Sequence, residues 1–558
     1  MFGVVLIYRV LFVITYPLND LAYDSANYLA MIMTHKAHLV HPGGYPFFMN
    51  LFFFWYHAPG NLADPLWYPI ANPPSAAFIY ALQFIQHSIE LISLAVFFFC
   101  VSDIFNKWIA ALALIFVGMD IDTLTFTNMT YPEWLQADLL ILSLCAAYRA
   151  FVASEDGKKY LYYGVSFTLF VLCWVTKFNV LIFGLIFIPI YFAERSPRKR
   201  LMALAAGLSG AALFLLFLFG FHYPTTKSID LTADKGWLLF PKLEWSLGNQ
   251  KLVDAGLYTK RLIALNGVLP NRYGEMAGPF PFSKVDAVPA ATRGPYREKY
   301  LWLLKADEPE LDAFIKEHPL PKDFLFSYAF LPVSYYIGLK DSDDLATRVF
   351  FEIALRHLGL YVKNNLLGIW ELGRTYPTEW RLAFGVMLPI AGRESPVVPK
   401  DSREVLKNVK DLGLGFVRYE FSDPPKNWAY PYLSTRPVLW KPGEKLFSLA
   451  SELVMPTGIL IVAVGLMFAY ALVLLFKDGV TVRTFVAWFI ALSIPGFIGY
   501  SNFSFLFRNK ELRLIWPILG TAYSIGTWWL CTLGYQVLSR GRRRTGSGGG
   551  TSGASGSV

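Results

Sequence analysis

The sequence predicts an all-α polytopic membrane protein with about ten transmembrane helices, external surface helices and a mixed external domain. Three observations indicate this class. The chain of 558 residues is 55% hydrophobic and only 16% charged, whereas soluble domains average about 25% charged residues. Apolar runs long enough to span a bilayer recur along the chain. Its 16 Trp and 31 Tyr suit the aromatic belts found at membrane surfaces.

Ten apolar runs define the expected spans, each judged by its length against a bilayer core of about 30 Å. The first run, residues 3–18, is short at about 24 Å. Because no signal-cleavage pattern follows it, we expect it to remain as an anchor. The other runs are residues 76–101, 108–119, 134–152, 160–175, 178–192, 201–221, 449–476, 482–500 and 512–538.

The net charge of +9 is concentrated in basic clusters at the ends of these runs. Alternating the spans places the clusters on one side of the membrane: Lys158 and Lys159, residues 195–200, Lys477, and residues 540–544. Basic residues are retained on the cytoplasmic side, so we expect an inner-membrane protein with both termini in the cytoplasm. The charge therefore indicates orientation and no nucleic-acid partner.

This topology divides the chain into four parts. Residues 1–221 form an N-terminal transmembrane module, 222–448 an external, periplasmic domain, and 449–544 a C-terminal transmembrane module. Residues 545–558 are a Gly/Ser-rich linker or tag remnant. The cysteines lie in apolar runs and are interpreted as small buried hydrophobes, not as disulfide partners or zinc ligands; they are Cys100, Cys145, Cys173 and Cys531.

Residues 346–372 of the external domain carry apolar residues at helical spacing with basic residues between them. This pattern predicts an amphipathic helix lying on the membrane surface. A helix buried within the external domain explains the same pattern equally well.

The polar stretch "YDSANYLAMIMTHKAHLVHPGGYPFF" follows the first span. Apolar residues at helical spacing after Asp24 predict a surface helix, and the Pro-Gly-Gly turn ends it and starts a second one from Tyr45. The two helices would hold His41 near Asp24 at the membrane surface. The simpler interpretation makes Asp24 an N-terminal helix cap and His41 an exposed turn residue.

Three acids lie between the third and fourth spans, on the same predicted side. Asp120 and Asp122 have a spacing that can hold a divalent cation through oxygen ligands, although such pairs often occur by chance. Glu133 follows Pro132 at the head of the fourth span, where an acid also stabilises the start of a helix. No cofactor is expected, and Asp120 and Asp122 are the place for a metal if there is one.

Basic residues occur on the external side against the positive-inside rule. Lys177 lies in the turn between the fifth and sixth spans, where snorkelling to the interface is the alternative explanation. The last span opens with Arg508, Lys510, Glu511 and Arg513. A phosphate group at the membrane surface would explain these external cations.

In their order and predicted side, these residues resemble the GT-C superfamily of membrane glycosyltransferases, such as protein O-mannosyltransferases and lipid A aminoarabinose transferases. The matching positions are Asp24 with Tyr28, the turn His41-Pro42-Gly43-Gly44-Tyr45, Glu133 after Tyr131-Pro132, Lys177, and Glu511-Leu512-Arg513. The chain departs from the pattern at Ser25, where many members have a second acid, at Gly43, where Pro is usual, and at Leu514, where Tyr is common. The resemblance covers the first seven spans and the last one.

The resemblance implies an inverting transfer of a sugar from a polyprenyl-phosphate donor, such as undecaprenyl phosphate, at the periplasmic face. Asp24 would be the general base. The donor phosphate would be bound by Lys177, Arg513, Arg508 and His41. The sugar or acceptor would contact Glu133, Tyr28, Tyr45 and Glu511. The acceptor would be a glycolipid, a polysaccharide or a protein.

Two other functions fit the sequence. A transporter or flippase of lipid-linked glycans would also use external cations, but transporters place polar residues and helix breaks near the bilayer midplane. Apart from Arg9 and a few other polar residues, the spans show little of this. A glycan polymerase or ligase that uses lipid pyrophosphates also combines many spans with a large external loop. A non-catalytic receptor is the least favoured interpretation.

Overall fold

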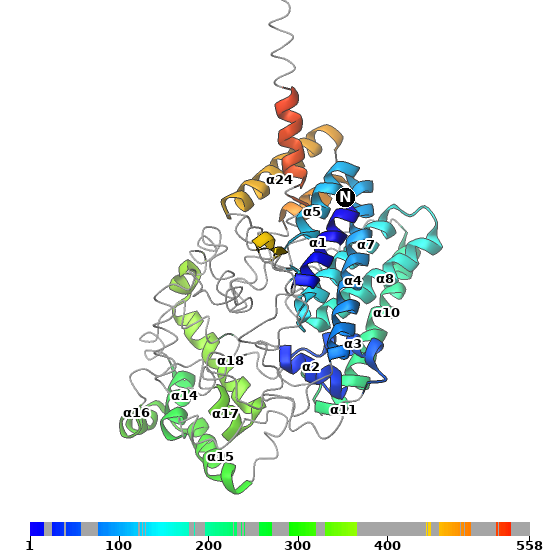
Figure 1. Ribbon diagram of the computed structural model, residues 1–558. Coiled ribbons are helices and arrows are strands. Elements are labelled where there is room, and N and C mark those ends of the chain that lie inside the picture. Colours follow the sequence, from blue (N-terminus) through cyan, green and yellow to red (C-terminus); the bar gives the residue numbers. More distant parts are fainter. Residues whose placement is uncertain are drawn as a thin grey trace, which may run out of the picture.

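The computed structural model (Figure 1) consists of a helical bundle and a separate cluster of helices. Most of the described residues are helical, and none of them is in a strand. The structure describes residues 1–15, 25–37, 41–56, 76–120, 130–177, 196–226, 256–269, 290–319, 330–364, 457–479, 486–492 and 524–536, with shorter pieces between them.

Apolar helices of the N-terminal half pack side by side to form the bundle. In order of contact, α10 packs on α8, α8 on α7, α7 on α4, α4 on α5, and α5 on α1. Their bounds are α1 (Phe2–Thr15), α4 (Ala76–Ile104), α5 (Lys107–Gly118), α7 (Pro132–Val152), α8 (Asp156–Thr176) and α10 (Pro197–Phe217). Each of these helices starts and ends within a few residues of the run expected from the sequence.

Three described helices are long and apolar enough to cross a membrane, namely Tyr80–Ile104, Pro132–Val152 and Pro197–Thr226. The helices α1 and α5 are apolar but shorter. In the C-terminal module, α24 (Thr457–Asp478) matches the run expected at 449–476, and residues 486–492 and 524–536 are helical. The expected run at 178–192 lies almost entirely outside the described residues, so the count of about ten spans stays a prediction.

Local sequence signals explain where these helices begin. Asn106 caps α5, because its side-chain oxygen accepts hydrogen bonds from the backbone N–H groups of Trp108 and Ile109, both at 2.9 Å. Pro132 occupies the first turn of α7, where its missing N–H costs no hydrogen bond. Glu133 in the same turn and Arg149 in the last turn both complement the helix dipole.

The two ends of the bundle differ in charge. At one end, the turn between α7 and α8 meets the start of α10, where Lys199 Nζ lies 2.8 Å from Asp156. Arg149 lies 2.7 Å from Asp103 at the same end. This basic end therefore unites the clusters around Lys158 and residues 195–200, which the sequence analysis placed on one side of the membrane.

The opposite end carries the short helices α2 (Ser25–Thr34) and α3 (Gly44–Phe53), seen below the bundle in Figure 1. We call this end, where α2 and α3 meet the first turn of α7 and the last turn of α8, the mouth of the bundle. Here α10 continues through a π-helical turn, Leu218–His222, into α11 (Tyr223–Thr226). The Phe47 ring of α3 packs on Phe217 and Phe221, with centroids 5.5 and 5.7 Å away.

A second cluster of helices with its own apolar core forms part of the region 222–448. It contains α14 (Leu257–Val268), α15 (Ala290–Lys305), α16 (Glu308–Glu317), α17 (Phe330–Ile337) and α18 (Leu339–Arg356). Glu352 on α18 joins two of them, since its carboxylate accepts the backbone N–H groups of Tyr258 and Thr259 at the start of α14, at 3.2 and 2.9 Å. The region is therefore a folded helical unit within the described residues, and not a linker.

Candidate functional site

Aromatic side chains from three segments meet at the mouth of the bundle. The Tyr28 ring on α2 lies 5.5 Å from the His41 ring and 5.8 Å from the Tyr45 ring of α3. It also lies 6.5 Å from the ring of Tyr131, just before α7. Trp134 on α7 stands edge-on to Tyr45 at 6.1 Å. The structure therefore brings Tyr28, His41 and Tyr45 together at one end of the bundle, while Asp24, the expected neighbour of His41, lies outside the described residues.

Gly44 allows α3 to sit directly on the end of α8. A Cβ atom at this position would lie only 2.4 Å from the backbone N of Thr176 and the carbonyl C of Val175. No larger residue fits there without moving one helix away from the other, since both obstacles are backbone atoms. At Gly43 a Cβ atom would meet only the Phe221 and Phe217 rings, at 3.2 and 3.4 Å.

Lys177 and Glu133 form an ion pair across the mouth, with Lys177 Nζ 3.2 Å from Glu133 Oε1. Glu133 is 5% exposed and Lys177 24% exposed, so only the lysine reaches the surface. The backbone of Lys177 is also fixed. Its N–H donates to the carbonyl of Cys173 at 3.2 Å, and its carbonyl accepts from Gln136 Nε2 at 2.6 Å. Glu133 and Gln136, which lie about one turn apart on α7, therefore hold the side chain and the backbone of Lys177.

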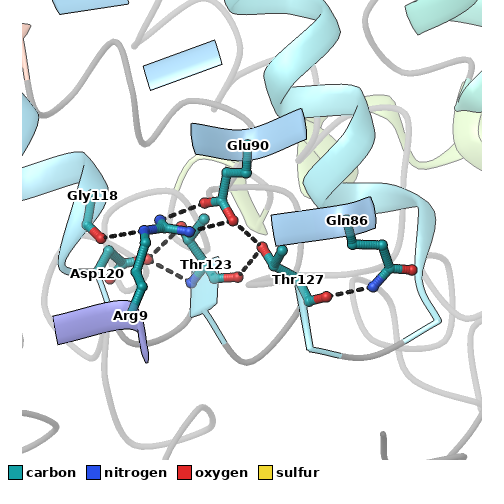
Figure 2. A network of polar contacts seen from close by, with 7 residues as sticks. All are labelled: Arg9, Gln86, Glu90, Gly118, Asp120, Thr123 and Thr127. Atoms are coloured by element: carbon teal, nitrogen blue, oxygen red, sulfur yellow. Dashed lines mark hydrogen bonds and ion pairs between the residues drawn. The ribbon is translucent and has the colours of Figure 1, made fainter. Parts of the chain in front are cut away.

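A network of buried polar side chains lies beside the mouth and is shown in Figure 2. Arg9 Nη2 donates to Glu90 Oε1 at 2.6 Å, and Arg9 Nη1 lies 2.5 Å from Glu90 Oε2. Arg9 Nε donates to the carbonyl of Gly118 at 2.8 Å, at the end of α5. Both charged side chains are 2% exposed. The pair therefore ties α1, α4 and the end of α5 together inside the bundle.

The same network orders the connection between α5 and α7. The Thr127 hydroxyl lies 2.6 Å from Glu90 Oε2 and 2.8 Å from the carbonyl of Thr123. Asp120 Oδ2 accepts the backbone N–H and the hydroxyl of Thr123 at 2.7 and 2.6 Å. Asp120 thereby caps a short helical turn. The described residues contain no group of three or more His, Cys, Asp or Glu that could hold a metal, and Asp122 lies outside them.

A chain of hydrogen bonds joins this network to the aromatic cluster. Gln86 Nε2 donates to the carbonyl of Thr127, and the Tyr45 hydroxyl donates to Gln86 Oε1 at 2.6 Å. Burial raises the pKa of Tyr45 well above its usual range, so the hydroxyl stays protonated and can donate. Gln83 Nε2 also donates a hydrogen bond to the carbonyl of Asn128 at 3.2 Å. One face of α4 thus holds both the connection before α7 and the first turn of α3.

The structure brings together Tyr28, His41, Tyr45, Glu133 and Lys177 from the set expected in the sequence. Asp120 lies in the neighbouring network, where it stabilises a turn. The other expected residues lie outside the described part of the chain, and their positions stay predictions: Asp24, Asp122, Arg508, Glu511 and Arg513.

The sequence analysis underestimated the polar residues inside the spans. Gln83, Gln86 and Glu90 stand at helical spacing on one face of α4, and all three are buried. His87 on α4 and Asp138 on α7 are buried near them. The spacing of three and four residues in an otherwise apolar run was the available signal, because polar side chains at such spacing share one helix face.

Comparison with known proteins finds no matching family model, no similar curated protein and no similar solved structure. The function is therefore argued from the residues at the mouth of the bundle.

The Arg9–Glu90 pair generates the first testable prediction. Glu90→Ala leaves a buried arginine without its carboxylate, which typically costs about 3–5 kcal/mol. We expect the variant to lose that much stability in unfolding measurements in detergent or nanodiscs. A cost below about 1 kcal/mol would contradict the role given to the pair.

The matched control is the double variant Arg9→Met/Glu90→Met, which removes both charges and keeps similar volumes. It should recover most of the stability. Amide hydrogen exchange at Thr127 and Asn128 should stay faster than in the wild type, because the bond from Thr127 to Glu90 is still missing.

The two glycines before Tyr45 provide a second prediction. Gly44→Ala should destabilise the protein by about 1–3 kcal/mol, because the added methyl group overpacks a contact between backbones. Gly43→Ala, one residue earlier, should change stability by less than about 0.5 kcal/mol, since a side chain can adjust there. Equal effects of the two substitutions in thermal unfolding would contradict the packing of α3 on α8.

Proposed function

We propose that this protein is a GT-C-type membrane glycosyltransferase, which moves a sugar from a polyprenyl-phosphate donor to an acceptor hydroxyl. The observation that carries the proposal is the ion pair of Lys177 and Glu133 at the mouth, beside Tyr28 and His41. These residues come from α2, the turn before α3, α7 and the end of α8. They are the described part of the set through which the sequence resembles that superfamily.

The proposed orientation places the basic end in the cytoplasm and the mouth on the external face. Positive side chains near Lys158 and Lys199 favour the cytoplasmic side for the basic end. A lipid-linked donor has its tail in the bilayer, its phosphate at the surface and its sugar just outside. A site at the mouth meets all three parts of such a donor.

The proposed reaction is a single inverting displacement. Asp24, which directly precedes α2 in the sequence, removes the proton from the acceptor hydroxyl. The acceptor oxygen bonds to the anomeric carbon, and the bond from that carbon to the lipid phosphate oxygen breaks. Both electrons of the broken bond leave with the phosphate. The sugar passes through an oxocarbenium-like state, as in glycoside hydrolysis.

Cationic side chains stabilise the phosphate that leaves. Lys177 is suited to this task, because its ammonium group is a charged donor that is partly exposed at the mouth and held there by Glu133. Glu133 holds the lysine in place before the donor arrives. The proposal adds His41, Arg508 and Arg513 to the phosphate site, and Glu511 and Tyr28 to the sugar or acceptor site. Tyr45 supports this arrangement through its bond to Gln86.

The transporter alternative gains one observation, because charged residues are buried inside the bundle. Their bonds favour a structural role, since Glu90 contacts Arg9 with both oxygens and Thr127 with one of them. These bonds fix a connection between helices. A lipid-pyrophosphate polymerase or ligase would share the cationic mouth, and its requirement for a pyrophosphate donor distinguishes it.

The third prediction concerns Asp24. The gene is deleted in its host and replaced by wild type or Asp24→Asn at matched membrane levels, and the envelope glycans are compared by mass spectrometry. We expect one sugar to disappear on deletion, to return with wild type and to stay absent with Asp24→Asn, because the amide cannot accept the proton.

Asp20→Asn is the matched control, since Asp20 lies four residues earlier in the same segment. It should restore the sugar fully. Full restoration by Asp24→Asn would make Asp24 a helix cap and favour the transporter.

The fourth prediction concerns Lys177. Lys177→Gln should weaken binding of polyprenyl monophosphate to the protein in nanodiscs by roughly 10- to 150-fold, the usual worth of a hydrogen bond to a charged group. Because this change leaves Glu133 without its cation, the double variant Lys177→Gln/Glu133→Gln serves to separate phosphate binding from stability. The double variant should be stable and still bind weakly.

Lys158→Gln is the control at the basic end, where Lys158 is exposed and bonded to Glu155. It should bind the lipid phosphate as wild type does. Unchanged binding in both Lys177 variants would contradict the proposed phosphate site.

A further inference from the structure

The helix α18 has two apolar faces, and the described residues cover only one of them. Val349, Phe350 and Ile353 point into the core of the α14–α18 cluster and are buried. On the opposite face, Phe351, Leu355 and Leu358 are 54, 66 and 52% exposed. The sequence left open a helix buried within the external domain or a helix on the membrane surface. One face of α18 is buried as the first interpretation expects, and the opposite face is the apolar, exposed one that the second requires.

The exposed apolar residues form a stripe. Phe351 and Leu355 are four positions apart, so they lie above one another on α18. The helix α18 ends at Arg356, and Leu358 opens the next helical segment after a turn at His357. After His357 the chain continues as helix through residues 358–364, with Tyr361 N–H bonded to the carbonyl of His357 at 2.8 Å. Leu366, beyond this segment, is also 54% exposed. Single exposed apolar residues are ordinary, but a stripe of large ones marks an interaction surface.

Charge changes along the same helix. Its first half carries Asp341, Asp343 and Asp344 against Lys340 and Arg348, whereas the exposed Lys363 lies beside the apolar stripe after its second half. The other basic residue there, Arg356, turns toward Glu352 and toward Gly256 at the start of α14. In Figure 1 α18 rises from the cluster toward the level of the bundle, with its acidic first half at the far end. Apolar side chains flanked by basic ones are the pattern of a helix that lies in the headgroup region of an anionic bilayer.

We infer that the second half of α18, the helical segment 358–364 and Leu366 dock on the surface of the lipid bilayer on the mouth side of the bundle. The stripe enters the boundary between headgroups and acyl chains, and Lys363 faces the lipid phosphates. The helix thereby fixes the α14–α18 cluster against the membrane next to the mouth. This inference depends on the bundle being embedded in a membrane and does not depend on the glycosyltransferase proposal.

The test uses the full chain in nanodiscs with a fluorescent bimane label. Cys100, Cys145 and Cys173 are buried, so Cys531→Ser removes the one described exposed thiol. The label is then placed by Leu355→Cys, with Leu358→Cys as a second position. Quenching by lipids with a nitroxide near the headgroup is compared with quenching by iodide in water.

Two variants serve as references. Asp344→Cys places the label on the same helix side, 11 residues or about 16 Å earlier, where water should surround it. Leu208→Cys places it on α10, where Leu208 is 66% exposed on a candidate membrane span. These positions give the expected signals for water and for lipid.

We expect lipid quenching at Leu355→Cys to be several-fold stronger than at Asp344→Cys, and iodide quenching to be several-fold weaker. Replacing phosphatidylglycerol with phosphatidylcholine should reduce the lipid quenching, because Lys363 loses its anionic partners. If the lipid quenching stays the same, basic side chains do not contribute to docking, and the apolar stripe alone accounts for it. Iodide quenching equal to that at Asp344→Cys would overturn the inference. Shielding from both quenchers would also overturn it, since protein would then cover the stripe.

Discussion

The ion pair of Arg9 and Glu90 is the constraint on which the rest of the bundle depends. Removing two charges from water costs several kcal/mol for each ion, and only close, well-bonded partners recover that cost. Here the bonds that offset this cost form only when α1, α4 and the end of α5 lie at the same level along the bundle axis. The reason is that Arg9 on α1 bonds both to Glu90 on α4 and to the carbonyl of Gly118 on α5. A shift of one helix along another would leave a buried charge unpaired. The pair therefore sets the register of three helices that apolar packing alone would allow to slide.

This register explains why α5 is so short. Its 12 residues span about 18 Å, well below the thickness of a bilayer core. A chain that leaves a helix inside an apolar bundle exposes backbone polar groups, which must find partners. The side chains of Arg9, Gln86 and Gln83 supply them, because they bind the carbonyl groups of Gly118, Thr127 and Asn128. Through these bonds the connection to α7 is held against α4, and it leads to Tyr131 and Glu133 at the mouth.

The sequence predicted the helices of the bundle well, because run length and apolar composition determine them locally. It also predicted two short helices joined by the Pro-Gly-Gly turn, and α2 and α3 have this arrangement. The expected proximity of His41 to Asp24 stays a prediction, because Asp24 lies outside the described residues. It did not predict that Glu133 pairs with Lys177, because the pairing depends on how α7 packs against α8. The polar face of α4 was visible as a spacing, but its partners come from α1 and from residues 118–128. Such long-range partners are set by the packing of whole helices, which one sequence does not reveal.

The pairing of Glu133 with Lys177 bears directly on the proposed chemistry. A lysine held only by solvent would have to be ordered when the donor binds, and that ordering would reduce the affinity. A lysine held by a buried carboxylate is ordered beforehand, and the Lys177 side chain is still 24% exposed. As the bond to the sugar breaks, the leaving phosphate gains negative charge, and the lysine can strengthen its bonds to phosphate at the expense of the one to Glu133. Such an interaction becomes stronger in the transition state than in the bound donor, which is the condition for accelerating the transfer.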